Sequence, residues 1–283
     1  MQFAEILEPF ERMLADTFPP ACIRALEKGG DWQPAWAAVE QSGFLNALVA
    51  EDRGGFGLGW DAAGTLFMAL GRHAVPLPVG ESVVLRGLLA AQGDTIPEGP
   101  LQPAGAPETL DALWRGGAVG TPVTLASGET RVQLALVYAA QIAGAAERVL
   151  EMSIAYANER VQFGKPIGRQ QAVQQQLAVM AEEMIAVRLS VELACSAGEP
   201  DLLCTASAKS IASRYAASIA ATAHAVHGAI GISAEYDLQL YTRRMQTWRL
   251  ACGGESHWDA VIGEAALASN DTVLDWVRRR LHR

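Results

Sequence analysis

The sequence predicts a mainly α-helical protein in which an N-terminal helical domain precedes a C-terminal up-down helix bundle. Near the start of the chain, apolar residues recur every three or four positions, at Phe3, Ile6, Leu7, Phe10 and Leu14. This is the spacing of one helix face. From residue 131 onward, long alanine-rich apolar segments are separated by short turns. We therefore divide the chain into a helical domain (1–95), a linker (96–130) and a bundle (131–283).

The overall composition indicates a globular protein and excludes several classes of partner. Half of the 283 residues are hydrophobic, 19% are charged and the net charge is −9, which argues against nucleic acid as a partner. No apolar run reaches the ~18 residues of a membrane span, and the acidic N-terminus is unlike a signal peptide. The four cysteines show no C-x-x-C spacing, and His224 and His227 lack a third ligand, so no metal site is expected. We expect a cytoplasmic protein with reduced thiols.

Several short helices are predicted within 1–95. A glycine-rich stretch at 51–60, E-D-R-G-G-F-G-L-G-W, is typical of a turn between two of them, and Asp61 is the expected N-cap of the following helix. It is not a phosphate-binding loop, because it follows a helix and lacks the Lys-Ser/Thr pair. One more helix, Val79–Gln92, closes this domain.

The segment 93–130 differs in character from the helical parts of the chain. Prolines are scattered through it, at Pro97, Pro100, Pro103, Pro107 and Pro122. Two short strands fit at most, one of them within 118–124. From there on, five helices are expected, at 131–158, 168–197, 201–227, 234–250 and 254–283. The first is apolar on more than one face, as the central helix of a bundle should be.

The turn between the first two bundle helices carries the most informative motif. Gly164, Pro166 and Gly168 break the helical pattern. Residues 159–167, E-R-V-Q-F-G-K-P-I, resemble the E-R-x-x-F-G-x-P-I turn of the acyl-CoA dehydrogenase family, and the family's Q-x-V-Q-x-x-L-A pattern follows. The G-G-F-G-L-G turn, the L-G-R at 70–72 and the P-x-P at 76–78 are similar to less specific motifs of the same family.

The resemblance implies a fold and also a departure from it. Between its two helical domains the family normally inserts a β-barrel that holds the flavin ring and the thioester end of the substrate. Such a barrel needs at least roughly 60 residues, and the segment 93–130 is too short for it. We therefore expect an acyl-CoA dehydrogenase-like fold with a truncated β domain.

The same resemblance implies a cofactor, FAD, shared across a subunit interface. In the family, the arginine and phenylalanine of the turn reach the flavin of a neighbouring subunit, and the arginine pairs with its pyrophosphate. Arg160 and Phe163 stand at those positions, with Gln162 between them. A guanidinium suits this role because its planar fork matches phosphate oxygens. The alternative is that Arg160 pairs with a carboxylate such as Glu159 or Glu182.

A second cofactor-binding region is implied at 227–236, H-G-A-I-G-I-S-A-E-Y. It resembles the family's Q-x-x-G-G-x-G-x-x-x-E-Y loop, with Gly228 and Gly231 at matching positions. Ala225 stands where the family often has a flavin-contacting glutamine, and Ala229 replaces the second glycine. We therefore expect weaker flavin contacts than in a typical member.

The family's reaction needs a carboxylate that removes the α-proton of an acyl-CoA while the β-hydrogen leaves as hydride to the flavin. The usual position of this base aligns with Gly253 and the alternative position falls near Leu134, and neither is an acid. The remaining candidate catalytic residues are Glu255 and Glu235. For Glu255 we favour a structural role, since it suits the first turn of the last helix.

The function implied is that of a subunit supporting FAD-dependent α,β-dehydrogenation of an acyl-CoA thioester. Its partners would be a second, full-length acyl-CoA dehydrogenase subunit, further copies of itself, or both. Some members of the family form heterotetramers of two different chains, in some bacteria acting on the CoA esters of steroid side chains. Two alternatives remain. One is a self-sufficient homo-oligomeric enzyme that uses Glu255 or Glu235, and the other is a non-catalytic scaffold without cofactor.

Overall fold

The computed structural model describes residues 4–104, 120–124, 128–196 and 198–281. Its N-terminal part contains the helices α1 (Ala4–Thr17), α2 (Pro20–Glu27), α3 (Gln33–Gln41), α4 (Trp60–Arg72) and α5 (Val79–Gln92), with 3-10 turns η1 (Phe44–Asn46) and η2 (Glu51–Arg53). The predicted helix Val79–Gln92 is confirmed at both ends. It stops at Gly93, whose φ of 80° ends the helix without steric cost.

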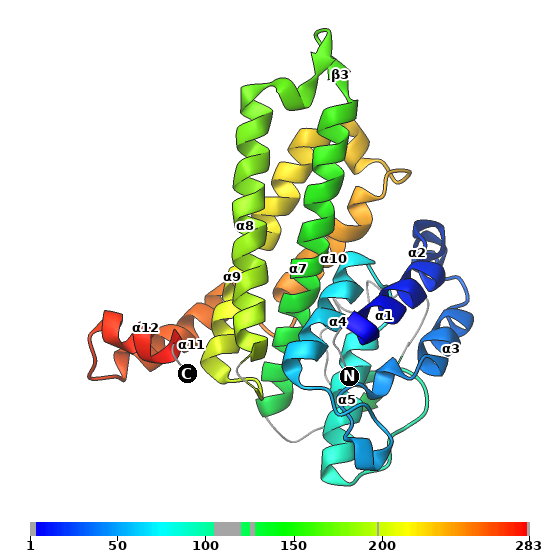
Figure 1. The fold of residues 1–283 in the computed structure, drawn as a ribbon, viewed down its shortest axis with the longest axis vertical. Coiled ribbons are helices and arrows are strands. Elements are labelled where there is room, and N and C mark those ends of the chain that lie inside the picture. The colour runs from blue at the N-terminus through cyan, green and yellow to red at the C-terminus, as the bar shows by residue number, and fades with distance from the viewer. Residues whose placement is uncertain (1–3, 105–119, 125–127, 197, 282–283) are drawn as a thin grey trace.

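The C-terminal part is the predicted helix bundle. It contains α7 (Gly128–Glu159), α8 (Gln171–Ser196), α9 (Leu202–His227), α10 (Leu238–Leu250), α11 (Glu255–Leu267) and α12 (Val273–Leu281), with 3-10 turns η3 (Ile167–Arg169) and η4 (Gly228–Ile232). In Figure 1 the long helices α7 and α8 run along the molecule's long axis, with the N-terminal helices on one side and α12 on the other. None of the described helices is both long enough and apolar enough to cross a membrane.

Several predicted helix boundaries differ from the structure, three of them in ways that have a clear local cause. Asp61 does not cap α4, because the helix begins one residue earlier and Gly59 is the N-cap. The predicted helix 234–250 begins only at Leu238, since η4 and a loop occupy the preceding residues. The predicted last helix, 254–283, is broken at 268–272, where Thr272 starts a new helix by accepting the Asp275 N–H on its Oγ1 at 3.2 Å.

In the linker, the described strands are short. Strand β1 (Leu101–Pro103) pairs in parallel with β2 (Thr121–Val123), so a strand lies within 118–124 as predicted. The Leu101 N–H donates to Ser82 Oγ at 2.8 Å, which fixes β1 against the first turn of α5. Over the described residues the fold is helical with two short strand pairs, in agreement with the expected acyl-CoA dehydrogenase-like fold with a truncated β domain.

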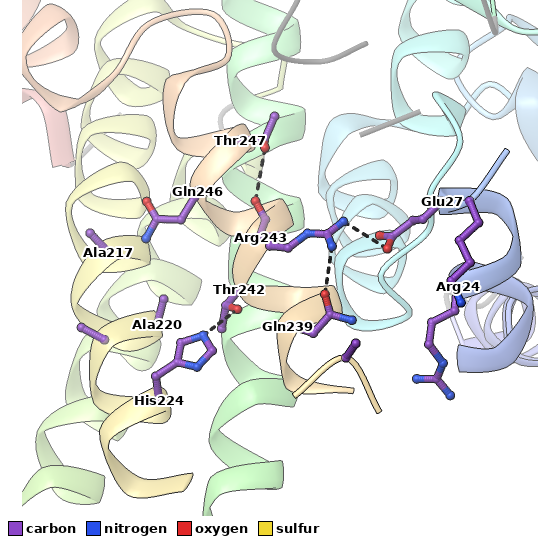
Figure 2. A pocket seen from close by; sticks show the side chains of 13 residues that line it. Arg24, Glu27, Ala217, Ala220, His224, Gln239, Thr242, Arg243, Gln246 and Thr247 are labelled. Carbon is purple, nitrogen blue, oxygen red and sulfur yellow. Dashed lines mark hydrogen bonds and ion pairs between the residues drawn. The ribbon is translucent and has the colours of Figure 1, made fainter. Parts of the chain in front are cut away.

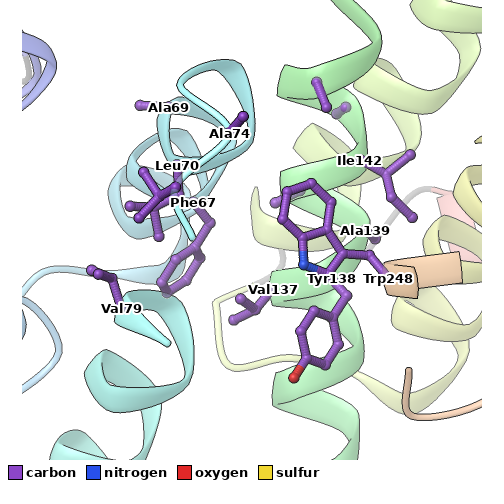
Figure 3. Packing of buried hydrophobic residues seen from close by; sticks show 14 of the residues in the cluster. Phe67, Ala69, Leu70, Ala74, Val79, Val137, Tyr138, Ala139, Ile142 and Trp248 are labelled. Carbon is purple, nitrogen blue, oxygen red and sulfur yellow. The ribbon is translucent and has the colours of Figure 1, made fainter. Parts of the chain in front are cut away.

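The hydrophobic core is built around α7. Its middle section is buried on all sides, which agrees with the absence of a polar face in the sequence. Figure 3 shows Tyr138 and Ile142 of α7 beside Trp248 of α10, with Phe67 and Leu70 of α4 on the opposite side. One continuous core thus joins the N-terminal helices to the bundle.

Two glycines allow α4 and α7 to pack backbone against backbone. A Cβ added at Gly71 would lie 1.9 Å from the Gln141 carbonyl oxygen, and one added at Gly144 would lie 1.8 Å from the Met68 carbonyl oxygen. No side chain can be placed at such distances without moving one helix. The crossing of α4 and α7 therefore depends on both glycines.

Buried ion pairs hold α2 against α10. The guanidinium of Arg244 is almost fully buried and donates to Glu27 Oε1 at 2.8 Å, while Arg243 reaches the other carboxylate oxygen at 3.0 Å. Burial lowers the pKa of Arg244, and the Glu27 carboxylate opposes that shift. Because a buried charge without its partner is costly, Glu27 fixes the position of α2.

The glycine contact yields a stability prediction. Gly144→Ala should lower the free energy of unfolding by at least about 3 kcal/mol, because the new methyl group overlaps the α4 backbone. Gly263 is a matched control, since it lies inside α11 and an added Cβ would meet no atom within 4 Å. Gly263→Ala should be neutral or stabilise by about 0.5–1 kcal/mol. Denaturant titrations compare the two, and a Gly144→Ala chain as stable as wild type would disprove the contact.

Candidate functional site

The predicted cofactor turn forms a tight hairpin at the end of α7. Strand β3 (Val161–Gln162) pairs antiparallel with β4 (Lys165–Pro166). The two central residues, Phe163 and Gly164, have φ values of 53° and 78°, as two-residue hairpin turns often require. A left-handed phenylalanine costs about 1–3 kcal/mol, and its ring is 91% exposed. The chain thus presents an aromatic ring to solvent at some energetic cost.

Arg160 lies at the base of this hairpin and is free to bind a ligand. Its backbone is fixed, since its N–H donates to the Tyr156 carbonyl at 2.8 Å and its carbonyl accepts from the Ile167 N–H at 2.8 Å. Its side chain is exposed and forms no ion pair with any residue that the structure describes. The alternative that Arg160 pairs with Glu159 or Glu182 therefore finds no support.

The second predicted region lies at the same end of the bundle. Tyr156, four residues before Arg160, stacks on His227 with ring centroids 4.6 Å apart, and Tyr236 contacts both rings. Burial lowers the pKa of His227, so the stacked imidazole is neutral at pH 7, and its Nδ1 lies 2.8 Å from the Ala223 carbonyl. This aromatic cluster fixes the start of η4 relative to the hairpin.

The two candidate glycines of this region are glycines for different structural reasons. Gly228 ends α9 with a φ of 61° and is exposed, so its backbone is open to a ligand. Gly231 is buried, and a Cβ there would lie 2.9 Å from His227 Cβ. Packing alone explains a glycine at Gly231.

We define the tip surface as Arg160, Val161, Phe163, Ile230 and Ile232. All four apolar members are exposed large hydrophobic residues. Gln162 is also exposed, within β3. Exposed apolar groups next to an unpaired cation are typical of a surface that meets another molecule.

Glu255 has an environment that keeps it ionised. It is the first residue of α11, and both its carboxylate oxygens accept hydrogen bonds from Arg249. The Arg249 guanidinium lowers the pKa of Glu255, whereas a general base in this reaction needs a raised one. Glu235 is exposed in the loop after η4. Neither carboxylate therefore has the desolvated surroundings of a base.

The two positions where the family carries its base cannot easily accept one here. Gly253 has a φ of 107°, and a Cβ there would lie 2.6 Å from His257 Cδ2 and 3.2 Å from Arg131 Nη2. Leu134 is buried in the core. A glutamate at either position would require local rearrangement.

The structure instead reveals a buried carboxyl that sequence reasoning missed. Glu81, in the first turn of α5, is 2% exposed, and its Oε1 accepts the Tyr138 hydroxyl at 2.9 Å. Its Oε2 has no partner among the described residues. Burial raises the pKa of Glu81 to about 7, although its own backbone N–H and Tyr138 oppose the shift. The only sequence signal was an acid inside the apolar run V-G-E-S-V-V-L.

A buried amine, that of Lys209 in α9, lies against the end of α10. Lys209 Nζ donates to the carbonyls of Trp248 and Arg249, each at 2.8 Å, and to Ser213 Oγ at 2.9 Å. Burial lowers the pKa of Lys209 to about 7. With all three hydrogen bonds satisfied, Lys209 acts as a C-terminal cap that holds the turn carrying Gly253.

A groove of about 850 Å³ lies between α2, α9 and α10 (Figure 2). Ala217 and Ala220 line it from α9, and Arg24 and Arg243 from α2 and α10. His224 also lines it and is 3.0 Å from Thr242 Oγ1 through Nε2. None of the predicted site residues lines this groove. Across the described residues, no three His, Cys, Asp or Glu side chains are grouped to hold a metal ion.

Comparisons with known proteins point in one direction. Residues 131–267 match the family described as "Acyl-CoA dehydrogenase, C-terminal domain". "Acyl-CoA dehydrogenase IpdE2" of Mycobacterium tuberculosis is 29% identical over 291 residues, covering 84% of this chain and 88% of that protein. IpdE2 of Mycolicibacterium smegmatis is 28% identical over 269 residues, covering 80% and 86%.

Solved structures show the same fold. A chain of the ChsE4-ChsE5 complex from Mycobacterium tuberculosis is similar with a TM-score of 0.77 and 21% identity, covering 96% of this chain and 100% of that one. The likeness shows the arrangement of helices and says nothing by itself about activity.

The buried Glu81 yields a pH-dependence prediction. Its folded pKa of about 7 lies above the ordinary 4.5, so the fold favours the protonated form. Its contribution to stability is present below pH 4.5 and is lost as the pH rises through 7, a change of about 3 kcal/mol. Glu81→Gln should remove this loss, so the variant should gain on wild type between pH 5 and pH 8. Urea titrations at both pH values measure it, and parallel stability curves would contradict a buried, titrating carboxyl.

Proposed function

Because the chain is a shortened member of the acyl-CoA dehydrogenase family, we propose that it completes the flavin site of an acyl-CoA dehydrogenase complex. In this proposal a second, full-length subunit supplies the β domain that this chain lacks. Together the two chains support FAD-dependent α,β-dehydrogenation of an acyl-CoA thioester.

The observation that carries the proposal is the tip surface. Arg160 has no carboxylate partner among the described residues, and Phe163 is exposed in a strained backbone conformation. Strain of this kind persists where a segment has a binding role. An aromatic ring beside a free guanidinium is the combination found at binding hot spots.

The location of the tip surface favours a ligand shared with another chain. Arg160 follows the last residue of α7, whereas Tyr138 and the buried Glu81 lie about six turns earlier, roughly 32 Å away at 1.5 Å per residue. A base must lie within hydrogen-bond reach of the proton that it removes. The two ends of α7 therefore serve different parts of an assembly.

The residues of this chain fit one end of FAD. Arg160 would hold the pyrophosphate through charge-assisted hydrogen bonds, and Phe163 would cover an apolar part of the cofactor. The described strands of this chain are too short to hold the flavin ring, so the partner subunit would hold it. Bound FAD would supply the acceptor for the β-hydrogen of the acyl group.

The names of similar proteins support a two-chain assembly. The ChsE4-ChsE5 structure is that of a complex of two named chains. A second structure, the Tcur3481-Tcur3483 steroid ACAD, has a TM-score of 0.78 and 21% identity, and covers 95% of this chain and 100% of that one. A steroid-derived acyl-CoA is accordingly the substrate class that we propose to test first.

One observation favours a second candidate function, a chain that carries its own base. The Glu81 carboxyl is desolvated and has an unpartnered oxygen, which are properties of catalytic carboxylates. In that case Glu81→Gln would abolish acyl-CoA oxidation with flavin retained. In the proposed supporting subunit, the same variant keeps measurable turnover.

The test of the proposal is Arg160→Ala in the chain co-purified with its full-length partner. Loss of the guanidinium should weaken FAD binding by roughly 2–4 kcal/mol, or about thirty- to a thousandfold. Arg160→Lys should have an intermediate effect, since it keeps the charge but loses the planar fork. Arg214→Ala, which removes an exposed cation of α9, should leave FAD affinity unchanged. Equal flavin content in all four complexes would refute the role of Arg160.

The same preparation tests the candidate carboxylate on α11. Glu255→Gln should leave acyl-CoA oxidation nearly intact and should lower stability by about 1 kcal/mol, because Glu255 stabilises the first turn of α11. Turnover is followed by reduction of an artificial electron acceptor. A loss of several orders of magnitude in rate with flavin still bound would identify Glu255 as the base.

A further inference from the structure

The groove between α2, α9 and α10 contains no residue of the tip surface and plays no part in the proposed function (Figure 2). Its volume of about 850 Å³ falls within the roughly 300–1,000 Å³ of small-molecule sites. On one side, Ala217, Ala220 and Ala221 share a face of α9 and form an apolar wall. Because these side chains end at Cβ, they leave open space between α9 and the polar residues opposite.

The other side of the groove carries an excess of positive charge. Glu27 is the only acid among the described lining residues, and its two oxygens are taken by Arg244 at 2.8 Å and Arg243 at 3.0 Å. Arg24 pairs with Asp237, just before α10. The lining residues and their ion-pair partners thus include two acids and four cations, the cations being Arg24, Lys28, Arg243 and Arg244. This excess lies on a protein whose net charge is −9.

Several hydrogen-bond donors in the groove are still free. Lys28 is exposed and forms no ion pair with any residue that the structure describes. Arg243 uses Nη1 for Gln239 at 2.9 Å and Nη2 for Glu27, which leaves three of its five N–H groups. The side-chain amide of Gln246 makes no hydrogen bond within the described part of the chain. These donors can therefore bind an acceptor without breaking an existing contact.

We propose that this groove binds a small organic anion with a flat apolar body, the chemistry shared by aromatic carboxylates and organic phosphates. The alanine wall contacts the apolar body, and Lys28 and Arg243 hold the anionic group through charge-assisted hydrogen bonds. The Gln246 amide adds a neutral hydrogen bond that orients the ligand. Because the bound anion connects α2 to α9 and α10, it stabilises the folded chain as its concentration rises above the dissociation constant.

Helix packing alone does not explain these features. The ion pairs of Glu27 and Asp237 fix α2 against α10 and do not require an alanine wall on α9. Open space between helices forfeits dispersion contacts, and neither Lys28 nor Gln246 is held by a described partner. A ligand of the proposed class fills the space and supplies an acceptor for both.

The experiment titrates four probes into the full-length chain by isothermal calorimetry. Naphthyl phosphate and naphthoate carry an anion on the same flat body, naphthol carries the body without the anion, and inorganic phosphate carries the anion without the body. At least one naphthyl anion should occupy a single saturable site, about tenfold or more tighter than naphthol or inorganic phosphate. The tighter of the two anions shows whether the groove prefers a phosphate or a carboxylate.

Two variants place the binding in the groove. Lys28→Ala removes a free cation and should weaken binding of the anion about three- to tenfold. Ala221→Phe, at an exposed position of the alanine wall, fills the groove and should weaken it about tenfold or more. The matched controls are Arg12→Ala, at an exposed cation of α1, and Ala260→Phe, at an exposed alanine of α11. Both should leave the affinity unchanged, and circular dichroism confirms that each variant is folded.

Three results of the titrations would overturn the proposal. They are equal affinity for naphthol and the two anions, no saturable binding of either anion, and binding that Lys28→Ala and Ala221→Phe both leave unchanged. Displacement of FAD by the naphthyl anion, in the complex co-purified with the full-length subunit, would also overturn it, because the anion would then occupy the flavin site. The variants at Arg160 test the flavin site separately, so the proposed function and this site can fail or stand independently.

Discussion

The close contact between α4 and α7 at Gly71 and Gly144 is the constraint on which the rest of the structure depends. Backbone atoms of the two helices approach to distances that exclude any side chain. This contact brings the N-terminal helices onto the one helix that is buried along its middle. It also brings α5 close enough for Glu81 to accept the hydroxyl of Tyr138. The core, the buried carboxyl and the orientation of α7 all follow from it.

The length of α7 then separates two chemically different ends. One end holds a desolvated acid and a buried lysine whose pKa values are shifted toward neutrality from opposite directions. At the other end, Arg160 has no carboxylate partner among the described residues, and Phe163 is in a strained, exposed position. Buried ionisable groups and strained turns both lower stability, and proteins retain such features mainly where they have a function. The proposed role of the tip surface in binding another molecule rests on these two features.

Sequence reasoning succeeded where the signal was local. The helix bundle, the shortened linker and the turn at 159–167 follow from apolar spacing, chain length and a contiguous motif, so the mainly helical fold and the family were predictable. The pair of Glu81 and Tyr138 was not, because its members are 57 residues apart and meet only through tertiary packing. The break between α11 and α12 was missed because a Thr272 cap interrupts a segment with no proline or glycine at that point. The assignment of Glu255 or Glu235 as a base remains a prediction.

The amount of FAD bound per chain is the quantity that separates the supporting subunit from its alternatives. Absorbance at flavin wavelengths is measured for this chain alone, for the full-length subunit alone and for the two co-purified. The shared-site interpretation predicts almost no flavin in the lone chain and stoichiometric flavin in the pair, since Arg160 supplies one end of the site and the partner's β domain the other. One FAD bound to each copy of the lone chain would contradict it, and so would a colourless pair.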